Sequence, residues 1–408
     1  MFKGDGMNVP LLNLQLQYAP IKDEIRAAIN EVLESQQFIF GPQLESLERE
    51  IAQRVRVDHA IGVSSGTDAL LLSLMALGIG NGDLVLTSPF TFFSTASSIS
   101  RVGGTPVFAD VDPLTFTLSP EKVKATLSSM TGEQRGRVKA LIPVHLYGQC
   151  ADMDPLLSLA EEYNLAIIED AAQALGTQYA HSDAPGTFTA AGAMGVCGCF
   201  SFFPTKNLGG YGEGGMVVTH NPDVAAGVRK LRHHGCKSEH EQYHYDKIGI
   251  NGRLDALQAA ILRVKLKYLD RWTEQRRVNA DTYNKLFEEA KLAAGRDDQC
   301  GEAKPISLPF VRDNNLHVFH QYVVRAHKRD QLKDFLTENG IGCGIYYPIP
   351  LHLQPCFQEL GYTQGSLPEA EKAAGQVLAL PIFPEITFQQ QEAVVATIAR
   401  FYQTGGPR

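Results

Sequence analysis

Short apolar segments alternate with helical patterns over the first two-thirds of this 408-residue chain. The expected strands span residues 84–88, 106–109, 140–145, 165–169, 200–203 and 215–219. Strands without polar alternation, separated by helices, are typical of a mainly parallel sheet that is covered on both faces. The sequence therefore predicts an α/β fold for this part of the chain.

The last third of the chain has a different pattern. A long helical pattern covers residues 254–272, a strand is expected at 321–325, and a final helix is expected from about Thr387. A chain of this length can form two domains, each with its own core. We expect a large domain over residues 1–255 and a smaller α+β domain over residues 256–408.

Composition argues against several classes of protein. The net charge is −8, and no cluster of Lys and Arg is present, so we expect no nucleic-acid surface. No apolar run approaches the ~18 residues that span a bilayer, and the N-terminus lacks the apolar core of a secretory signal. The seven cysteines are odd in number and scattered, as expected for reduced thiols in the cytoplasm.

Two groups of residues are of the types that bind metals. They are Cys197 with Cys199, and the polar-loop residues His233, His234, His240 and His244. Neither group has the second pair of ligands or the spacing of a zinc site. We expect no metal, and we interpret the cysteines as small residues of a buried strand.

A lysine and an aspartate each follow an apolar run. Lys206 comes after Ser201-Phe-Phe-Pro-Thr and before a Gly-rich loop, and Asp170 ends the strand expected at 165–169. Most lysines are solvated, but this context favours a partly desolvated amine that can attack an aldehyde. A carboxylate at the end of a parallel strand can keep a pyridine nitrogen protonated. The pair therefore predicts chemistry that depends on pyridoxal phosphate (PLP).

Other segments fit such a cofactor more weakly. Gly66 and Thr67 open a helix whose free N–H groups can bind phosphate, although Ser-Gly-Thr is also a common helix cap. Ser201 could reach the same phosphate, and Gln173 could donate to the phenolic oxygen of the ring. One ring of the segment 90–93 could stack on the cofactor, although core packing is the more frequent use of such a run.

These segments belong to an ordered series of motifs. The series includes Ser65-Gly66-Thr67-Asp68-Ala69-Leu70, Pro143-Val-His-Leu-Tyr-Gly148, Glu169-Asp-Ala-Ala-Gln173, Ser201-Phe with Lys206, Gly249-Ile-Asn251-Gly-Arg253 and Tyr347-Pro-Ile-Pro-Leu-His352. In this order, and over nearly the whole chain, it resembles the PLP-dependent sugar aminotransferases of the DegT/DnrJ/EryC1/StrS family. The resemblance implies the type I aminotransferase fold, with a large PLP-binding domain, a smaller C-terminal domain and a homodimer with shared active sites.

The resemblance also implies roles for individual residues. Lys206 would be the Schiff-base lysine and the proton shuttle. The cofactor would be held by Gly66, Thr67, Phe92, Asp170, Gln173, Ser201 and Lys206, and by Asn251 of the neighbouring subunit. The substrate would contact Tyr243 and His244 of the loop 236–247, together with Tyr347 and His352. Dehydratases of the family have histidine in place of the lysine, so Lys206 disfavours that activity.

The implied reaction moves an amino group from L-glutamate or glutamine to a nucleotide-linked keto-hexose, through a pyridoxamine phosphate form. The segment 347–355 resembles that of enzymes that aminate the C-3 position of the sugar, giving amino sugars for surface polysaccharides or secondary metabolites. One alternative is a PLP enzyme that acts on a non-nucleotide substrate, in aminocyclitol or aminohydroxybenzoate synthesis. A non-catalytic PLP-binding regulator is another, which the complete set of Lys206, Asp170 and Gln173 and the expected lack of a DNA-binding segment disfavour.

Overall fold

The computed structural model describes residues 7–184, 186–237, 243–295 and 300–404. A seven-stranded sheet forms its centre, in the order β1-β9-β8-β5-β4-β2-β3. The strands are β1 (His59–Val63), β9 (Gly215–Thr219), β8 (Cys197–Ser201), β5 (Ala166–Asp170), β4 (Val138–Ile142), β2 (Leu84–Thr87) and β3 (Thr105–Phe108). Only β9 runs against its neighbours in this sheet, so the prediction of a mainly parallel sheet is confirmed.

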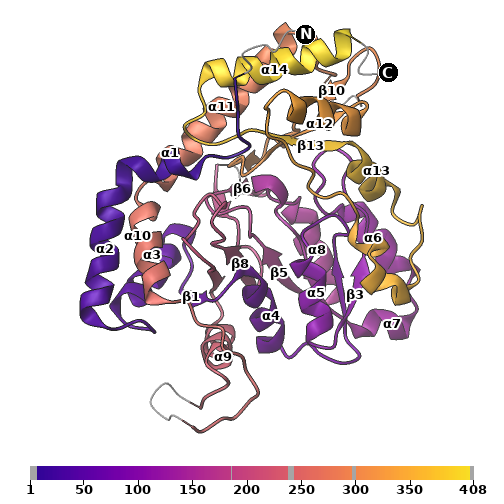
Figure 1. Ribbon diagram of the computed structural model, residues 1–408. Coiled ribbons are helices and arrows are strands. Elements are labelled where there is room, and N and C mark those ends of the chain that lie inside the picture. The colour runs from indigo at the N-terminus through magenta and orange to yellow at the C-terminus, as the bar shows by residue number, and fades with distance from the viewer. Residues whose placement is uncertain (1–6, 185, 238–242, 296–299, 405–408) are drawn as a thin grey trace.

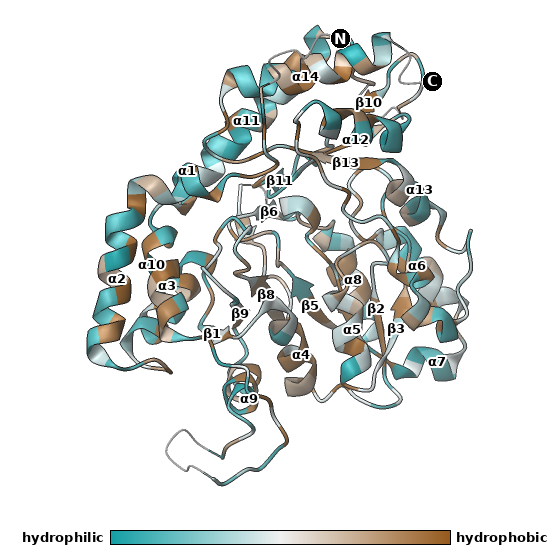
Figure 2. Ribbon diagram, in the orientation of Figure 1, coloured by the Kyte–Doolittle hydropathy of each residue, from teal (hydrophilic) through white to brown (hydrophobic). Residues whose placement is uncertain are grey.

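Both faces of the sheet are buried. Successive residues of one strand join different cores, as Ile167 and Ile168 of β5 do, because side chains alternate across a strand. The helices α4 (Gly66–Ala76), α5 (Ser94–Arg101) and α9 (Pro222–Arg232) contribute to one core. The other core is covered by α3 (Pro42–Val55), α6 (Pro120–Ser129), α8 (Met153–Tyr163) and α10 (Ala256–Leu266). Figure 2 shows apolar residues concentrated in the strands and on the helix sides that adjoin them.

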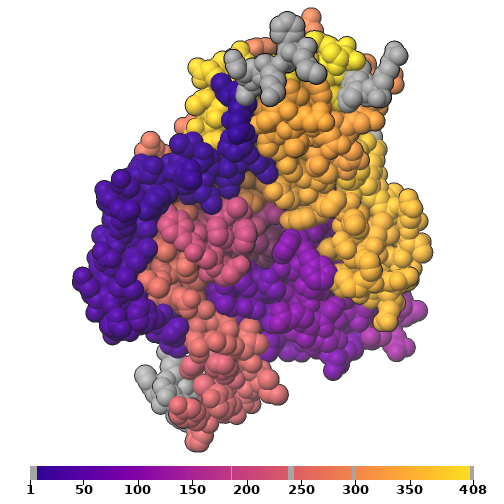
Figure 3. All heavy atoms as spheres, in the orientation of Figure 1, coloured from indigo at the N-terminus to yellow at the C-terminus, as the bar shows by residue number. Residues whose placement is uncertain are grey.

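The C-terminal part packs over the large sheet (Figure 1 and Figure 3). It contains the three-stranded antiparallel sheet β10-β12-β13 and its own apolar core. Its elements are β10 (Ile306–Ser307), β12 (Tyr322–Ala326), β13 (Val377–Leu380), α11 (Leu269–Glu289), α12 (Arg329–Glu338), α13 (Pro368–Gln376) and α14 (Phe388–Gln403). The smaller α+β unit is therefore present in the structure.

Short elements complete the fold. They are α1 (Leu14–Tyr18), α2 (Lys22–Ser35), α7 (Gly132–Arg137), the small sheet of β11 (Asn315–Leu316), β6 (Gln178–Ala180) and β7 (Phe188–Ala190), and the 3₁₀ turns at Ala19–Ile21, Leu146–Gly148, Leu351–Leu353 and Pro355–Leu360. Among the described residues, no helix is both long enough and apolar enough to span a membrane.

Two predicted elements differ from the structure. The single helix expected over residues 254–272 is two helices, α10 and α11, because the hydrogen bonding tightens where Tyr268 N–H donates to Lys265. The strand expected at 200–203 is β8, which begins at Cys197 and ends at Ser201, where the backbone turns to pair Phe202 with Gly214. Strand β1 was not predicted.

The boundary at residues 255 and 256 stays a prediction. Ala259 and Leu262 of α10 belong to a core of the large sheet, whereas Ala280, Tyr283 and Phe287 of α11 belong to the C-terminal core. Val9 also packs in the C-terminal core, although it lies at the other end of the chain. We propose that the large unit extends through α10 to about Lys267 and excludes the N-terminal segment around Val9.

Gly198 lies in β8, near the centre of the large sheet, where the backbone of Gly192 packs closely against it. A Cβ added to Gly198 of β8 would lie 2.2 Å from the Cα of Gly192 and 2.5 Å from its carbonyl oxygen. We expect Gly198→Ala to lower the free energy of unfolding by about 1–3 kcal/mol, because backbone on both sides must shift. Gly136 of α7 faces open space, so Gly136→Ala is the matched control and should be neutral or stabilising. If urea unfolding showed an equal loss in the free energy of unfolding for both variants, the close contact between Gly198 and Gly192 would be contradicted.

Candidate active site

Asp170 lies at the centre of the site, at the carboxyl end of β5. This strand lies between β4 and β8, both parallel to it, so three strand ends meet here. The carboxylate is buried and accepts hydrogen bonds from Thr95 Oγ1 (2.7 Å) and from the Ala172 N–H (3.2 Å). Burial raises the pKa of Asp170, while these hydrogen bonds and the positive charge of Lys206 oppose the rise.

Lys206 stands in the loop that follows β8. Its N–H donates to Phe203 in a tight turn, and its amine has no hydrogen-bond partner among the described residues. Desolvation lowers the pKa of Lys206 to about 8, although the charge of Asp170 acts in the opposite direction. A lysine with such a pKa is partly neutral near physiological pH, which is the form that attacks an aldehyde.

The first turn of α4 forms the third part of the site. Ser65 caps the helix by accepting the N–H of Asp68 (3.0 Å), whereas the N–H groups of Gly66 and Thr67 have no partner within the described residues. A Cβ on Gly66 would lie only 2.7 Å from Cβ of Ser201, so the missing side chain lets α4 approach the end of β8. Free N–H groups beside a serine hydroxyl are suited to a phosphate.

Gln173 connects this site to the C-terminal unit. Its Oε1 accepts the N–H of Tyr147 (2.7 Å), and its Nε2 donates to the hydroxyl of Tyr347 (3.2 Å). Burial and the negative charge of Asp170 raise the pKa of Tyr347. We expected the amide of Gln173 to donate to the phenolic oxygen of a cofactor, and in this structure it donates to the phenol of Tyr347 instead. The local sequence around Gln173 could not reveal this partner.

The other predicted residues are distributed unevenly around this cluster. Phe92 is 58% exposed and its ring lies 6.1 Å from that of Tyr347. His352 is buried in a pair with Glu371 (3.0 Å). Asn251 forms a backbone bridge with His233 in the segment after α9. The roles predicted for these residues remain predictions.

Tyr243 and His244 lie in the same segment after α9, which projects from the body of the molecule (Figure 1). Tyr243 is 81% exposed. His240 of the histidine group lies outside the described residues. Among the residues that the structure describes, no three side chains of His, Cys, Asp or Glu are arranged to hold a metal ion.

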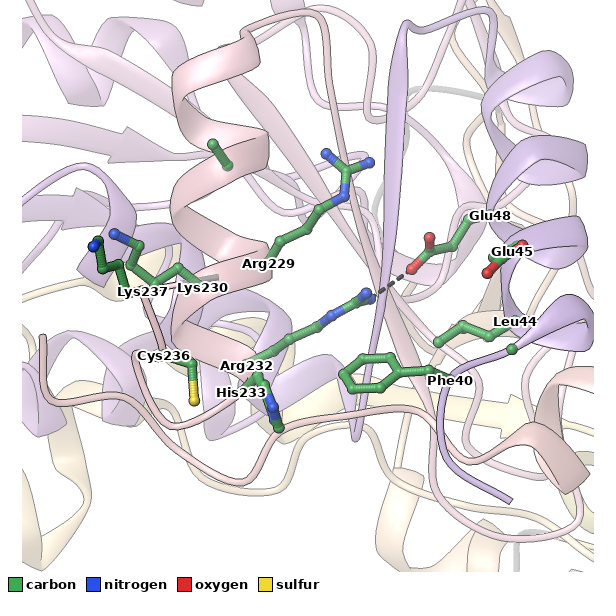
Figure 4. A pocket seen from close by; sticks show the side chains of 12 residues that line it. Phe40, Leu44, Glu45, Glu48, Arg229, Lys230, Arg232, His233, Cys236 and Lys237 are labelled. Atoms are coloured by element: carbon green, nitrogen blue, oxygen red, sulfur yellow. Dashed lines mark hydrogen bonds and ion pairs between the residues drawn. The ribbon is translucent and has the colours of Figure 1, made fainter. Parts of the chain in front are cut away.

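A separate cavity of about 460 Å³ lies between α3 and α9 (Figure 4). The ion pair of the buried Arg232 with Glu48 (2.5 Å) spans it, and the guanidinium of Arg232 lies 5.3 Å from the ring centroid of Phe40. Neither Lys206 nor Asp170 lines this cavity, so its size does not make it the site of the predicted chemistry.

Comparison with known proteins agrees with this geometry. The model of the DegT/DnrJ/EryC1/StrS aminotransferase family matches residues 19–399. The chain belongs to this family. Its residues therefore align with those of enzymes that transfer amino groups.

Two relatives illustrate the range of the family. The chain is 48% identical to a pleiotropic regulatory protein of Geobacillus stearothermophilus, over 97% of this chain and 99% of the relative. It is 41% identical to a UDP-N-acetyl-3-dehydro-α-D-glucosamine 3-aminotransferase of Acidithiobacillus ferrooxidans, over 96% and 97% of the two chains.

Solved structures show the same fold. DesV of S. venezuelae, crystallised in complex with a ketimine intermediate, matches with a TM-score of 0.86 at 38% identity, over 97% of this chain and 99% of that one. NtdA of Bacillus subtilis, with bound cofactor PMP, matches with a TM-score of 0.84 at 29% identity, over 99% and 87%. The fold is that of the PLP-dependent aminotransferases.

The pKa of Lys206 gives a testable pH dependence. When PLP is added to the cofactor-free protein, we expect the visible absorbance band to form faster as pH rises from 7 and to level off above about 8, because the neutral amine is the nucleophile. Asp170→Asn should shift the midpoint to lower pH, because the charge of Asp170 stabilises the lysine cation. A midpoint near the ordinary lysine value of 10.5, or an identical midpoint in both proteins, would contradict the described burial.

Proposed function

We propose that this protein is a PLP-dependent transaminase that carries an amino group from L-glutamate or glutamine to a nucleotide-linked keto-hexose. The supporting observation is the position of Lys206, a desolvated amine beside the buried carboxylate of Asp170. The free N–H groups of α4 and the hydroxyl of Ser201 lie where a phosphate would complete the set. These residues fit PLP in charge and in hydrogen-bonding capacity, and the absence of a side chain at Gly66 lets them come together.

When bound, PLP supplies an electron sink for the negative charge left at a carbon that loses its proton. Asp170 would hold a positive charge at the ring nitrogen, and its own pKa would fall as it gained that partner. Lys206 would take the proton from one carbon and return it at the next, as a general base and then a general acid. The burial of Asp170 and the desolvation of Lys206 strengthen the electrostatic effect of both groups.

We assign amination at C-3 of the sugar from the relatives. The Acidithiobacillus enzyme is named for a 3-aminotransferase reaction on a UDP-linked 3-keto sugar, and the alignment covers nearly all of both chains. The product would be an amino sugar for a polysaccharide or a secondary metabolite. All seven cysteines are free thiols, and we propose that the enzyme acts in the reducing cytoplasm.

We also propose a homodimer with shared active sites. Large apolar side chains are exposed at two places. They are Phe38 and Ile39 after α2, and Tyr243, Tyr245 and Ile248 in the segment after α9. The segment that carries Tyr243, His244 and Asn251 projects away from the body of its own chain (Figure 1). A second copy would cover these residues and let the segment reach the neighbouring Lys206.

The amino-donor half-reaction tests the proposed activity. Excess L-glutamate should convert the yellow PLP form into the colourless pyridoxamine form, which then serves to screen nucleotide keto-sugars. Lys206→Ala is the control, because it should neither show the lysine-bound band nor transfer the proton. A yellow protein that neither glutamate nor glutamine converts would contradict the activity.

The second candidate is a non-catalytic PLP-binding regulator. The name of the 48%-identical Geobacillus protein favours it. The complete set of Lys206, Asp170 and Gln173 favours the enzyme, because a regulator has no need of a proton shuttle. The glutamate experiment separates the two candidates, since a regulator would bind PLP and leave it unconverted.

The projecting segment gives a prediction of its own. If Tyr243 and His244 contact the nucleotide across the dimer, Tyr243→Phe and His244→Ala should each raise the KM for the sugar nucleotide by about three- to tenfold, the loss of one hydrogen bond. The glutamate half-reaction should be unchanged, because it involves no nucleotide. A KM equal to that of the unmodified protein would remove these residues from the substrate site.

A further inference from the structure

A second, smaller cavity lies beside the candidate active site. Its volume is about 110 Å³, and its polar lining comes from Thr205, Arg276, His320, Gln321 and Tyr346. Thr205 directly precedes Lys206, and the positive charge of Lys206 contributes to lowering the pKa of His320. The cavity therefore adjoins the reactive amine, and it has room for a group of a few non-hydrogen atoms rather than for a sugar ring.

Arg276 is the unusual component of this cavity. It is only 3% exposed, and no carboxylate pairs with it among the described residues. Its Nη1 donates to three carbonyl groups, those of Ile382 (3.0 Å), Phe319 (3.2 Å) and His320 (3.4 Å). Its Nε and Nη2 have no partner in the described part of the chain. Buried charges are nearly always paired. Glu385 attracts this guanidinium, but no hydrogen bond or ion pair joins the two in the described residues, so Arg276 can still bind an anion.

Burial does not remove the charge of Arg276. Desolvation lowers the pKa of Arg276 to about 10, and the charge of Glu385 acts against that decrease. The guanidinium thus remains protonated at neutral pH. Its planar fork of N–H groups matches the two oxygens of a carboxylate.

The neighbours of Arg276 leave room for such a group. His320 donates through Nδ1 to Asn207 Oδ1 (3.0 Å), so its ring is held by the residue that follows Lys206. Gln321 has a buried Oε1 without a hydrogen-bond partner. That oxygen is a hydrogen-bond acceptor, so it does not itself bind a carboxylate. The N–H groups of Arg276 that make no hydrogen bond within the described residues are the donors that an anionic ligand would complete.

We propose that this cavity binds a carboxylate of the amino donor, with Arg276 as its charged partner. The inference rests on the proposed function, which requires an α-amino acid whose amine reaches the position of Lys206. The cavity lies beside that position, and a dicarboxylate donor brings the anion that Arg276 lacks. A carboxylate on the sugar acceptor has the same chemistry, and the two sources are separated by the half-reactions below.

Gln321→Glu is the principal test, because it places a carboxylate of the protein itself in the cavity. The binding of glutarate, an unreactive dicarboxylate, is measured by calorimetry on the PLP-loaded protein. We expect the Kd for glutarate to rise at least about tenfold, as expected for the loss of a hydrogen bond to a charged group. The melting temperature should stay equal or rise, because Arg276 gains a partner. Gln321→Leu removes the amide without adding charge, and it should change the Kd less than threefold.

Arg276→Gln provides a second variant, with Arg277→Gln as its matched control. Arg277 is the next residue of α11, and its side chain is 39% exposed. We expect only the change at position 276 to weaken glutarate binding about tenfold or more. Arg276 also donates to three backbone carbonyls, so Arg276→Gln could weaken binding by destabilising the fold. If the melting temperature of this variant falls, the result for Gln321→Glu decides whether the cavity binds a carboxylate.

The two half-reactions identify the source of the carboxylate. If it belongs to the donor, Gln321→Glu should raise the concentration of L-glutamate needed for half-maximal conversion, and the reaction of the pyridoxamine form with a keto-sugar should be unchanged. An effect on the sugar reaction alone would overturn the assignment to the donor. Unchanged glutarate binding in Gln321→Glu would overturn the carboxylate site. If the unmodified protein binds glutarate but is not converted by L-glutamate, the proposed function fails while the site stands.

Discussion

The desolvation of two opposite charges, the buried Asp170 and the partly buried Lys206, is the constraint on which the rest of the site depends. Removal from water shifts the pKa of each group towards neutrality, whereas their mutual attraction works against both shifts. The hydroxyl of Thr95 adds a hydrogen bond that favours the charged form of Asp170. The outcome is a carboxylate ready for a cationic partner and an amine that gives up its proton easily, which are the two requirements of PLP chemistry.

Side chains alternate between the two faces of a strand, and this alternation lets β5 hold the carboxylate of Asp170 firmly. Asp170 and Glu169 are consecutive, so they project from opposite faces of the sheet. Glu169 is fully buried and accepts hydrogen bonds from His145 (2.8 Å), Gly192 (2.7 Å) and Gly195 (2.6 Å). It thereby fastens the loop before β8 to the end of β5. Glu169 therefore fixes the end of the strand on one face of the sheet, and Asp170 lies in the candidate site on the other face.

The local features of this fold were predictable from the sequence, and its long-range contacts were not. Runs of apolar residues without polar alternation predicted the parallel sheet, and Asp170 and Lys206 stood out because each follows such a run. Strand β1 was missed because Gly62 interrupts its apolar run and because its pairing with β9 joins residues more than 150 positions apart. The hydrogen bond between Gln173 and Tyr347 and the cavity beside Arg276 depend on how the C-terminal unit packs against the large sheet. No local pattern marks such contacts.

A second desolvated lysine, Lys265, allows a direct test of the central claim. Desolvation also lowers the pKa of Lys265 to about 8, but its amine donates to the carbonyl of Gly209 and lies 5.2 Å from the ring centroid of Tyr211. The PLP-loaded protein should be reduced with borohydride, digested and mapped by mass spectrometry. The account predicts a single phosphopyridoxyl group on the peptide that contains Lys206. A label on Lys265, or one spread over several lysines, would contradict it.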